Sequence, residues 1–227
     1  MLQLRDHKYK APHPANPTQI PQFFMPLPTL TTTEIQQRLQ AAPPLEELEE
    51  MIPGLPDEPR PAAVLLPLFR QQGQWRLLFI RRALNHKDRH SGEVAFPGGG
   101  VEADDPHPTG TALREAREEI GLEPDRVELL GQLPAFRTSS NFLVNPVVGH
   151  IPWPLPLRAD PQEVARIFSI PLEWLAQPDH HRVRPWQAPG HPMPRPVAFF
   201  EPYDGERLWG VSARITLSLV RCLRYNP

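Results

Sequence analysis

The sequence predicts an α/β protein in which a β-sheet packs between helices. Two apolar runs, at residues 62–69 and 75–82, are joined by Gln-Gln-Gly-Gln, a pattern typical of a β-hairpin. A helix is expected at 109–120, and an amphipathic helix is expected at 211–224. Strands interspersed with two main helices favour a sheet that is covered by helices.

Shorter elements fill the intervals between these segments. Further strands are expected at 127–136, 142–151 and 164–170, with a helical turn at 171–176 and a late hairpin formed by 196–202 and 207–210 around residues 203–206. The polar, proline-rich stretch 177–195 is expected to be a long loop. Such loops are often lids or substrate-selecting segments, although structural variation alone would explain this one.

The N-terminal part differs in composition from the rest. Residues 1–60 are expected to form a proline-rich extension, and residues 61–227 the main domain. Within the extension, the threonines at 31–33 can cap a short helix that stops before Pro43. A second short amphipathic turn is expected at 45–52.

Charge and cysteine content limit the binding partners and the cellular location that the sequence predicts. The formal net charge is −2, so there is no general electrostatic case for binding nucleic acid or a membrane surface. No run of apolar residues is long enough to span a bilayer. The single cysteine, Cys222, cannot form an intramolecular disulfide, so a cytoplasmic protein is expected. A homodimer, with the proline-rich arm at its interface, is compatible with this interpretation.

The most informative feature is a group of three glutamates in the predicted helix at 109–120. Glu115, Glu118 and Glu119 stand at positions i, i+3 and i+4, which places them on one helical face. Like charges at this spacing repel each other by roughly a few tenths of a kcal/mol per pair, and a divalent cation would offset this repulsion. Hard oxygen ligands suit Mg²⁺, Mn²⁺ or Ca²⁺. The alternative is an ordinary solvated helix in which Arg114 pairs with Glu118.

A glycine-rich turn precedes this helix. Residues 96–100 read Phe-Pro-Gly-Gly-Gly, and glycines allow the backbone to approach a ligand closely. A strand, a glycine turn, an acidic loop and a helix with clustered carboxylates are together more specific than the helix alone. The combination favours a catalytic metal site.

Residues 98–122 resemble the signature of the Nudix hydrolases, which is Gly, five residues, Glu, seven residues and then R-E-apolar-x-E-E-x-G-apolar. The second half matches from Arg114 onward. Strict counting places Gly100 and Pro106 at the glycine and glutamate positions, whereas a loop one residue longer places Gly99 and Asp105 there. We prefer the second alignment, because a proline side chain offers no oxygen.

The resemblance implies a Nudix-type α/β/α sandwich with a mixed central β-sheet and a pyrophosphatase site. It implies Mg²⁺ or Mn²⁺ as cofactor, held by the three glutamates and a carbonyl of Gly99 or Gly100. The three glutamates and Arg114 are the expected catalytic residues, with Arg114 orienting Glu118 or an acidic side chain of the 102–105 loop. One of the glutamates, or Glu163 from a distant loop, would accept the proton of the attacking water. Glu163 is equally well explained as a solvated loop residue.

The element before the glycine turn resembles that of Nudix enzymes that hydrolyse coenzyme A. Residues 77–82 lead through a basic stretch into Gly92, Val94 and the Phe-Pro-Gly-Gly turn, and the similarity covers about residues 60–224. It implies cleavage of coenzyme A or its derivatives to 3′,5′-ADP and 4′-phosphopantetheine. The alternatives are ADP-ribose, NADH or another nucleoside diphosphate derivative as substrate. A non-catalytic ligand-binding module is a further alternative, but its usual mark would be loss of the glutamates.

The basic stretch also supplies candidate substrate contacts. Coenzyme A carries an additional phosphate on its ribose, and clustered Arg and Lys side chains bind phosphate well. The predicted substrate-binding residues are Arg81, Arg82, Lys87, Arg89 and Phe96. A solvent-exposed loop that happens to be basic is the alternative. Phe136 and Phe142 could stack on an adenine, although aromatic residues at strand ends more often belong to the core.

Overall fold

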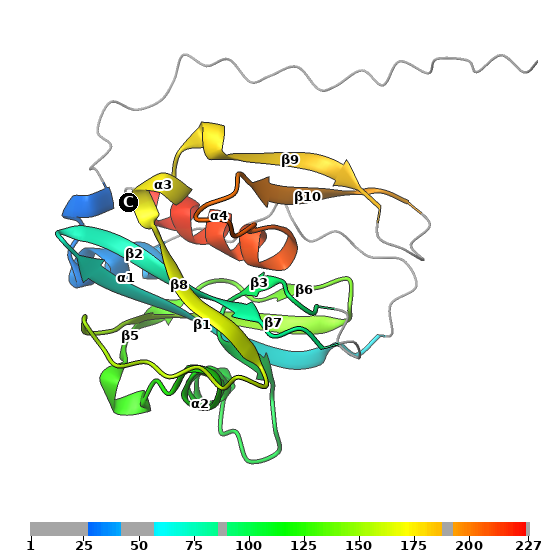
Figure 1. Cartoon of the computed structure of the whole chain (residues 1–227), viewed down its shortest axis with the longest axis horizontal. Coiled ribbons are helices and arrows are strands. Elements are labelled where there is room, and N and C mark those ends of the chain that lie inside the picture. The colour runs from blue at the N-terminus through cyan, green and yellow to red at the C-terminus, as the bar shows by residue number, and fades with distance from the viewer. Residues whose placement is uncertain (1–26, 42–56, 86–89, 188–192, 226–227) are drawn as a thin grey trace, which may run out of the picture.

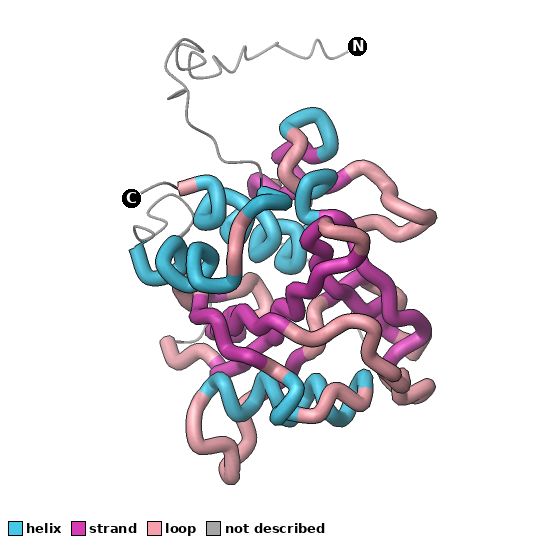
Figure 2. Tube along the Cα trace, turned by 90° about the vertical axis from the view of Figure 1, so that its left-hand side faces the viewer, coloured by secondary structure: helices cyan, strands magenta, loops and turns pink. Residues whose placement is uncertain are grey.

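The computed structural model describes residues 27–41, 57–85, 90–187 and 193–225. Within these ranges, eight strands form one mixed sheet (Figures 1 and 2). Helix α2 (Pro108–Ile120) covers one face, and α1 (Thr32–Ala41), α3 (Leu172–Leu175) and α4 (Gly210–Arg224) lie on the other. The predicted α/β class is confirmed, with its α/β/α layering. The predicted turn at 45–52 lies outside the described residues, as do Lys87 and Arg89.

Strand β1 (Arg60–Gln71) is the centre of the sheet. It pairs antiparallel with β2 (Gln74–Arg82), which confirms the predicted hairpin, and its first half pairs antiparallel with β4 (Gly98–Gly100). On its other side it pairs in parallel with β7 (Phe142–His150). A parallel pair needs a long crossover, and here the crossover includes β2, β4 and α2.

The remaining strands of this sheet extend it on both sides. The short β3 (Val94–Ala95) and the longer β8 (Val164–Pro171) pair with β2. The short strands β5 (Glu128–Gln132) and β6 (Phe136–Arg137) pair with β7. The strand expected at 127–136 is therefore divided in two, with Pro134, which has no N–H to donate to a ladder, between the two parts. Three-residue 3₁₀ helices lie at Leu27–Thr29, Pro124–Arg126 and Pro178–His180.

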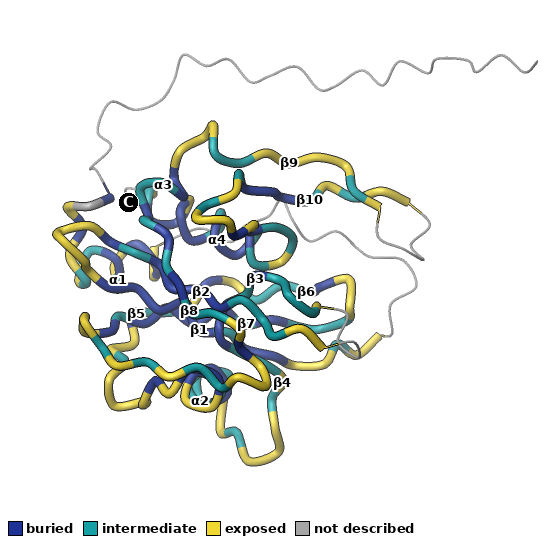
Figure 3. The backbone as a smooth tube through the Cα atoms, in the orientation of Figure 1, coloured by how far each residue is buried: buried dark blue, intermediate teal, exposed yellow. Residues whose placement is uncertain are grey.

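Two hydrophobic clusters hold the sandwich together, one on each face of the sheet. Figure 3 shows where the buried residues lie along the strands and helices. On the α2 face, Ala112, Ala116 and Ile120 pack against strand residues such as Leu65. On the other face, apolar residues of α1, α3 and α4 pack against alternate residues of β1 and β2. Burial of each large aliphatic side chain stabilises the fold by about 1.5–3 kcal/mol.

Helix α1 is part of this core. Thr31 and Glu34 form a reciprocal capping box, since Thr31 N donates to Glu34 Oε2 at 2.7 Å and Glu34 N donates to Thr31 Oγ1 at 3.2 Å. The buried Arg38 side chain donates to the carbonyl of Leu223 in α4, and the thiol of Cys222 donates to the Arg38 carbonyl at 3.3 Å. The helix predicted within the extension thus packs into the main fold. A domain division at residue 60 stays a prediction.

A separate two-stranded sheet lies beside α3 and α4, on the side of the main sheet opposite α2 (Figure 1). It pairs β9 (His181–Trp186) with β10 (Arg195–Phe200). The sequence led us to expect a loop where β9 lies, and a hairpin between 196–202 and 207–210. The 203–206 turn is present, but of that hairpin only a bridge between Phe199 and Trp209 forms. Helix α4 follows directly, and no helix in the described part of the chain is long and apolar enough to cross a membrane.

Candidate active site

Helix α2 is fixed at both ends, and this fixes the glutamates that it carries. At its start, the His107 ring accepts a hydrogen bond from Gly110 N at 3.0 Å. At its end, Gly121 adopts φ 66°, a left-handed conformation that favours glycine, and its amide donates to carbonyls of the last turn. Because Ala112 and Ala116 face the sheet, the glutamates are directed toward one edge of the helix. The helix predicted at 109–120 is confirmed.

The three glutamates differ strongly in burial. The Glu119 side chain is 1% exposed, and its Oε2 accepts a hydrogen bond from Gly98 N at 3.0 Å. Burial raises the pKa of Glu119 to about 8, and the charges of Glu115 and Glu163 act in the same direction. Burial also raises the pKa of Glu115, whereas the Glu118 side chain is 58% exposed. The site therefore contains one buried, one largely buried and one solvent-accessible carboxylate.

The glycine strand β4 and the helix meet at Gly99. A Cβ atom at this position would lie 2.3 Å from Glu115 Oε1, so any other residue here would require the Glu115 carboxylate to move. At Gly100 a Cβ would meet nothing within 4 Å, and the carbonyl of this residue accepts a hydrogen bond from Arg114 Nη2 at 3.1 Å. The two candidate glycines thus contact different parts of the site. Gly99 lies against a carboxylate, and Gly100 lies against the guanidinium.

Arg114 connects the acidic loop to the helix. Its Nε and Nη2 donate to the two oxygens of Asp105 at 3.1 and 3.0 Å, a bidentate pair, and the pKa of this carboxyl is held well below its usual range. Its Nη1 donates to Glu115 at 3.1 Å and to Glu118 at 3.0 Å. The structure therefore places Arg114 against both of its expected kinds of partner, Glu118 and an acidic side chain of the 102–105 loop.

The type of the donor groups fits a hard divalent cation. Among the described residues, no three acidic, histidine or cysteine side chains are arranged as a ready-made metal site, and Arg114 lies between Glu115 and Glu118. Glu119, however, is a buried carboxylate whose Arg82 neighbour is 3.9 Å away, so additional positive charge would favour its ionised form. Glu118 is exposed and can rotate toward Glu119. Glycine at position 99 leaves room for the carboxylate of Glu115.

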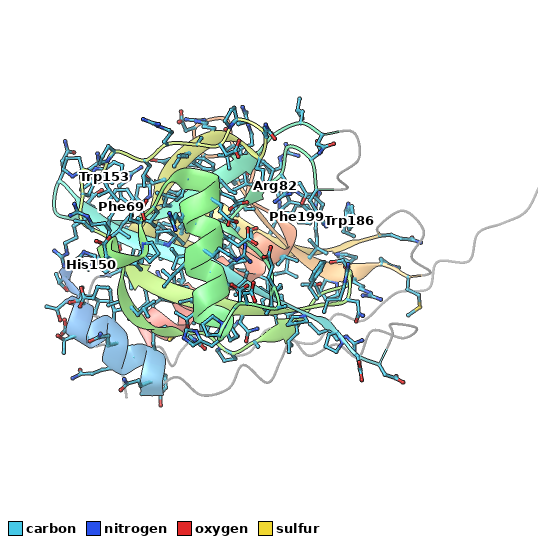
Figure 4. All side chains as sticks on the ribbon, turned by 90° about the horizontal axis from the view of Figure 1, so that it is seen from below. Phe69, Arg82, His150, Trp153, Trp186 and Phe199 are labelled. Atoms are coloured by element: carbon cyan, nitrogen blue, oxygen red, sulfur yellow. The ribbon has the colours of Figure 1, made fainter. Side chains whose placement is uncertain are left out.

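The predicted substrate contacts separate into three environments. Arg82 lies beside α2, close to Glu119 (Figure 4). Arg81, the preceding residue of β2, is directed to the opposite face and pairs with Glu206 at 3.4 Å. Phe96 is 3% exposed and packs against Phe79 with ring centroids 4.7 Å apart. The structure therefore places Phe96 in the hydrophobic core rather than at a surface that a ligand could contact.

Glu163 is brought close to the α2 carboxylates although it is distant in sequence. The preceding loop is tied to the end of the helix, since Asp160 N donates to the Glu119 carbonyl at 2.9 Å. The Glu163 carbonyl accepts from Ala83 N at 2.7 Å, directly after Arg82. Its charge contributes to the raised pKa values of Glu115 and Glu119. An exposed carboxylate thus stands beside the buried pair.

Other residues of interest lie on the α4 face of the sheet. Phe136 and Phe142 are partly buried, and they lie beneath the guanidinium groups of Arg214 and Arg60, respectively. No sequence pattern predicted a role for Glu206, a buried carboxylate in the turn before α4. A glutamate in a Tyr-Asp-Gly-Glu turn has the pattern of an ordinary exposed turn residue.

The fold and the site define an α/β/α protein with a carboxylate-bearing helix packed against a glycine strand. A family model described as the NUDIX domain matches residues 58–189, which is more than half of the chain. The chain therefore belongs to the Nudix family of pyrophosphohydrolases. The matched region includes the whole carboxylate site but ends before β10 and α4.

Relatives named as uncharacterized Nudix hydrolase NudL support this assignment. The proteins from Enterobacter sp. (strain 638) and Salmonella paratyphi B are each 38% identical over 168 residues, covering 74% of this chain and 85% of the relative. Among solved structures, a MutT/nudix family protein from Enterococcus faecalis aligns with a TM-score of 0.48 and 16% identity. That alignment covers 84% of this chain and 73% of the Enterococcus chain.

Proposed function

We propose that this Nudix enzyme hydrolyses the pyrophosphate bond of coenzyme A or its derivatives, giving 3′,5′-ADP and 4′-phosphopantetheine. The observation that carries the proposal is the position of two consecutive arginines at the end of β2. Arg82 lies 3.9 Å from Glu119 in the carboxylate site, and Arg81 is available on the other face of the strand. One cationic group for a phosphorylated substrate, Arg82, therefore lies next to the proposed catalytic residues, and a second, Arg81, lies on the opposite face of the same strand.

Mg²⁺ or Mn²⁺ would be held by Glu115, Glu118 and Glu119, with a backbone carbonyl of Gly99 or Gly100 as the further predicted ligand. When bound, such an ion neutralises charge on phosphate oxygens and lowers the pKa of a coordinated water. Rotation of Glu118 away from Arg114 would complete the carboxylate set.

The residues around the carboxylates have distinct roles in this proposal. Arg114, anchored by Asp105, holds the Glu115 carboxylate against Gly99 and so fixes the position of a ligand group. Proton acceptance from the attacking water is assigned to one of the glutamates on α2 or to Glu163.

The test is product analysis with the purified protein and Mg²⁺ or Mn²⁺. Coenzyme A, dephospho-coenzyme A, ADP-ribose and NADH are offered separately, with and without EDTA. We expect release of 3′,5′-ADP from coenzyme A, faster than AMP from dephospho-coenzyme A, and no turnover in EDTA. Preference for ADP-ribose or NADH would refute coenzyme A as the substrate but would still support pyrophosphate hydrolysis as the reaction.

Absence of turnover on all four compounds, with ligand binding intact, would contradict the enzymatic proposal and favour a ligand-binding module. The cytoplasmic location and the homodimer remain predictions from the sequence. Sedimentation of the purified protein tests the dimer directly.

A further inference from the structure

The buried carboxylate of Glu206 joins two arginines of neighbouring strands. Glu206 is 5% exposed, and its Oε1 lies 2.9 Å from Arg166 Nη1 and 3.4 Å from Arg81 Nη1. Arg81 and Arg166 are direct partners in the β2–β8 ladder. Like charges directly opposite each other on antiparallel strands repel, so the two guanidinium groups stay together because Glu206 lies between them.

The position of Glu206 is set by a tight turn. Tyr203 and Glu206 exchange two backbone hydrogen bonds of 2.9 Å, and Asp204 and Gly205 both have positive φ angles. Asp204 pairs with Arg166 but is 65% exposed, so its charge is screened by water. The turn thus presents one buried carboxylate to the two strands.

Arg81 retains most of its capacity to bind a ligand. Its side chain is 44% exposed, and Glu206 is its one ion-pair partner in the described part of the chain. Arg166 is more fully engaged, because it also donates to the carbonyl and carboxylate of Asp204. The three groups Arg81, Arg166 and Glu206 carry one net positive charge between them, and the exposed share of that charge is on Arg81.

We propose that Glu206 is the positioning residue for Arg81, which it holds ready to bind a phosphomonoester of the substrate beyond the scissile pyrophosphate. The inference rests on the proposed function, since it assigns a structural basis to the preference for a substrate with an additional phosphate. A planar guanidinium held at one nitrogen can still offer two parallel N–H groups to a phosphate. Free rotation of the side chain would weaken that contact.

The test compares the binding of two nucleotides that differ only in the phosphomonoester. Calorimetric titration with 3′,5′-ADP and with AMP needs no turnover, so its result is separate from that of the substrate assay. We expect the wild-type protein to bind 3′,5′-ADP about tenfold more tightly than AMP, the size of one charge-assisted hydrogen-bonded contact. Glu206→Gln should remove this preference and leave the binding of AMP unchanged.

Two further variants separate positioning from a structural role. Asp204→Asn, which removes an exposed partner of Arg166, is the matched control and should keep the preference for 3′,5′-ADP. Arg81→Gln should abolish the preference, and adding Glu206→Gln to it should have no further effect, because Glu206 acts through Arg81. Arg81 is surface-exposed, so this variant tests the site even if Glu206→Gln does not fold.

Three results would overturn the inference. The first is equal binding of the two nucleotides by the wild-type protein. The second is a change in affinity in Glu206→Gln that affects both nucleotides equally, or tighter binding of 3′,5′-ADP, which is expected if the carboxylate only lowers the positive charge of the cluster. The third is additive loss in the double variant. If coenzyme A is turned over, the same logic predicts a raised KM for coenzyme A in Glu206→Gln, with kcat and the KM for dephospho-coenzyme A unchanged.

Discussion

Glu119 is the buried member of the carboxylate site, and its burial has a cost that can be measured. The pKa of this group is raised from 4.5 to about 8, mainly by burial. Below pH 4.5 the carboxyl is protonated in both the folded and the unfolded chain. As pH rises from there toward 8, the unfolded chain loses the proton first, so the stability of the metal-free protein falls.

The size of the effect follows from the shift. At pH 7 the pH lies about 2.5 units above the pKa of this carboxyl in the unfolded chain, whereas the carboxyl in the folded chain is still largely protonated. At about 1.4 kcal/mol per unit, the free energy of unfolding at pH 7 is lower by about 3 kcal/mol than at low pH. Glu119→Gln removes the titration and keeps an acceptor for Gly98 N. It should therefore stabilise the metal-free protein by up to about 3 kcal/mol at pH 7, while turnover falls by orders of magnitude.

The assay is urea unfolding in EDTA, followed by circular dichroism, at pH 5 and at pH 7. The difference between wild type and Glu119→Gln should be small at pH 5 and grow toward pH 7. Glu118→Gln is the control, because its exposed carboxylate should change stability by less than about 0.5 kcal/mol. Equal stability of wild type and Glu119→Gln at pH 7 would refute the argument from burial. Near-normal turnover in both variants would refute the metal-site assignment.

Two further predictions concern the groups around this carboxylate. Gly99→Ala should reduce kcat by at least about a hundredfold, because the new methyl group would displace the Glu115 carboxylate, whereas Gly100→Ala should remain close to wild type in a steady-state assay. Comparable loss in the two alanine variants would contradict this division of roles. Asp105→Asn should reduce kcat about tenfold and leave KM nearly unchanged, since Arg114 loses its bidentate partner; an unaltered kcat would show that the pair does not position the site.

The elements that carry the active site could largely be predicted from the sequence, because the patterns that indicate them are local. The periodicity and the terminal glycine of α2, and the apolar runs of β1 and β2, each depend on residues close together in the chain. The contact between Arg114 and the acidic loop at 102–105 could also be predicted, because the two are close together in the chain. The proximity of Glu163 was only one of two alternatives, because it depends on a distant loop docking at the end of α2.

The parts that differed from expectation depend on tertiary packing. Strand β9 contains no alternation of apolar residues and is largely exposed on both faces, so only its pairing with β10 defines it. Phe96 stands in a turn that has the appearance of a ligand contact, yet it packs against Phe79 in the core. Glu206 acquires its importance solely from Arg81 and Arg166, which lie far away in the sequence.

The contact between α1 and α4 can form only late in the synthesis of the chain. Helix α4 leaves the ribosome about 170 residues after α1, which corresponds to roughly 10 to 30 s of translation. Throughout that time the Arg38 guanidinium has no Leu223 carbonyl to receive its hydrogen bond. A chain released at residue 189, where the family match ends, would contain every carboxylate of the active site and still lack the backbone acceptor for the Arg38 side chain of α1.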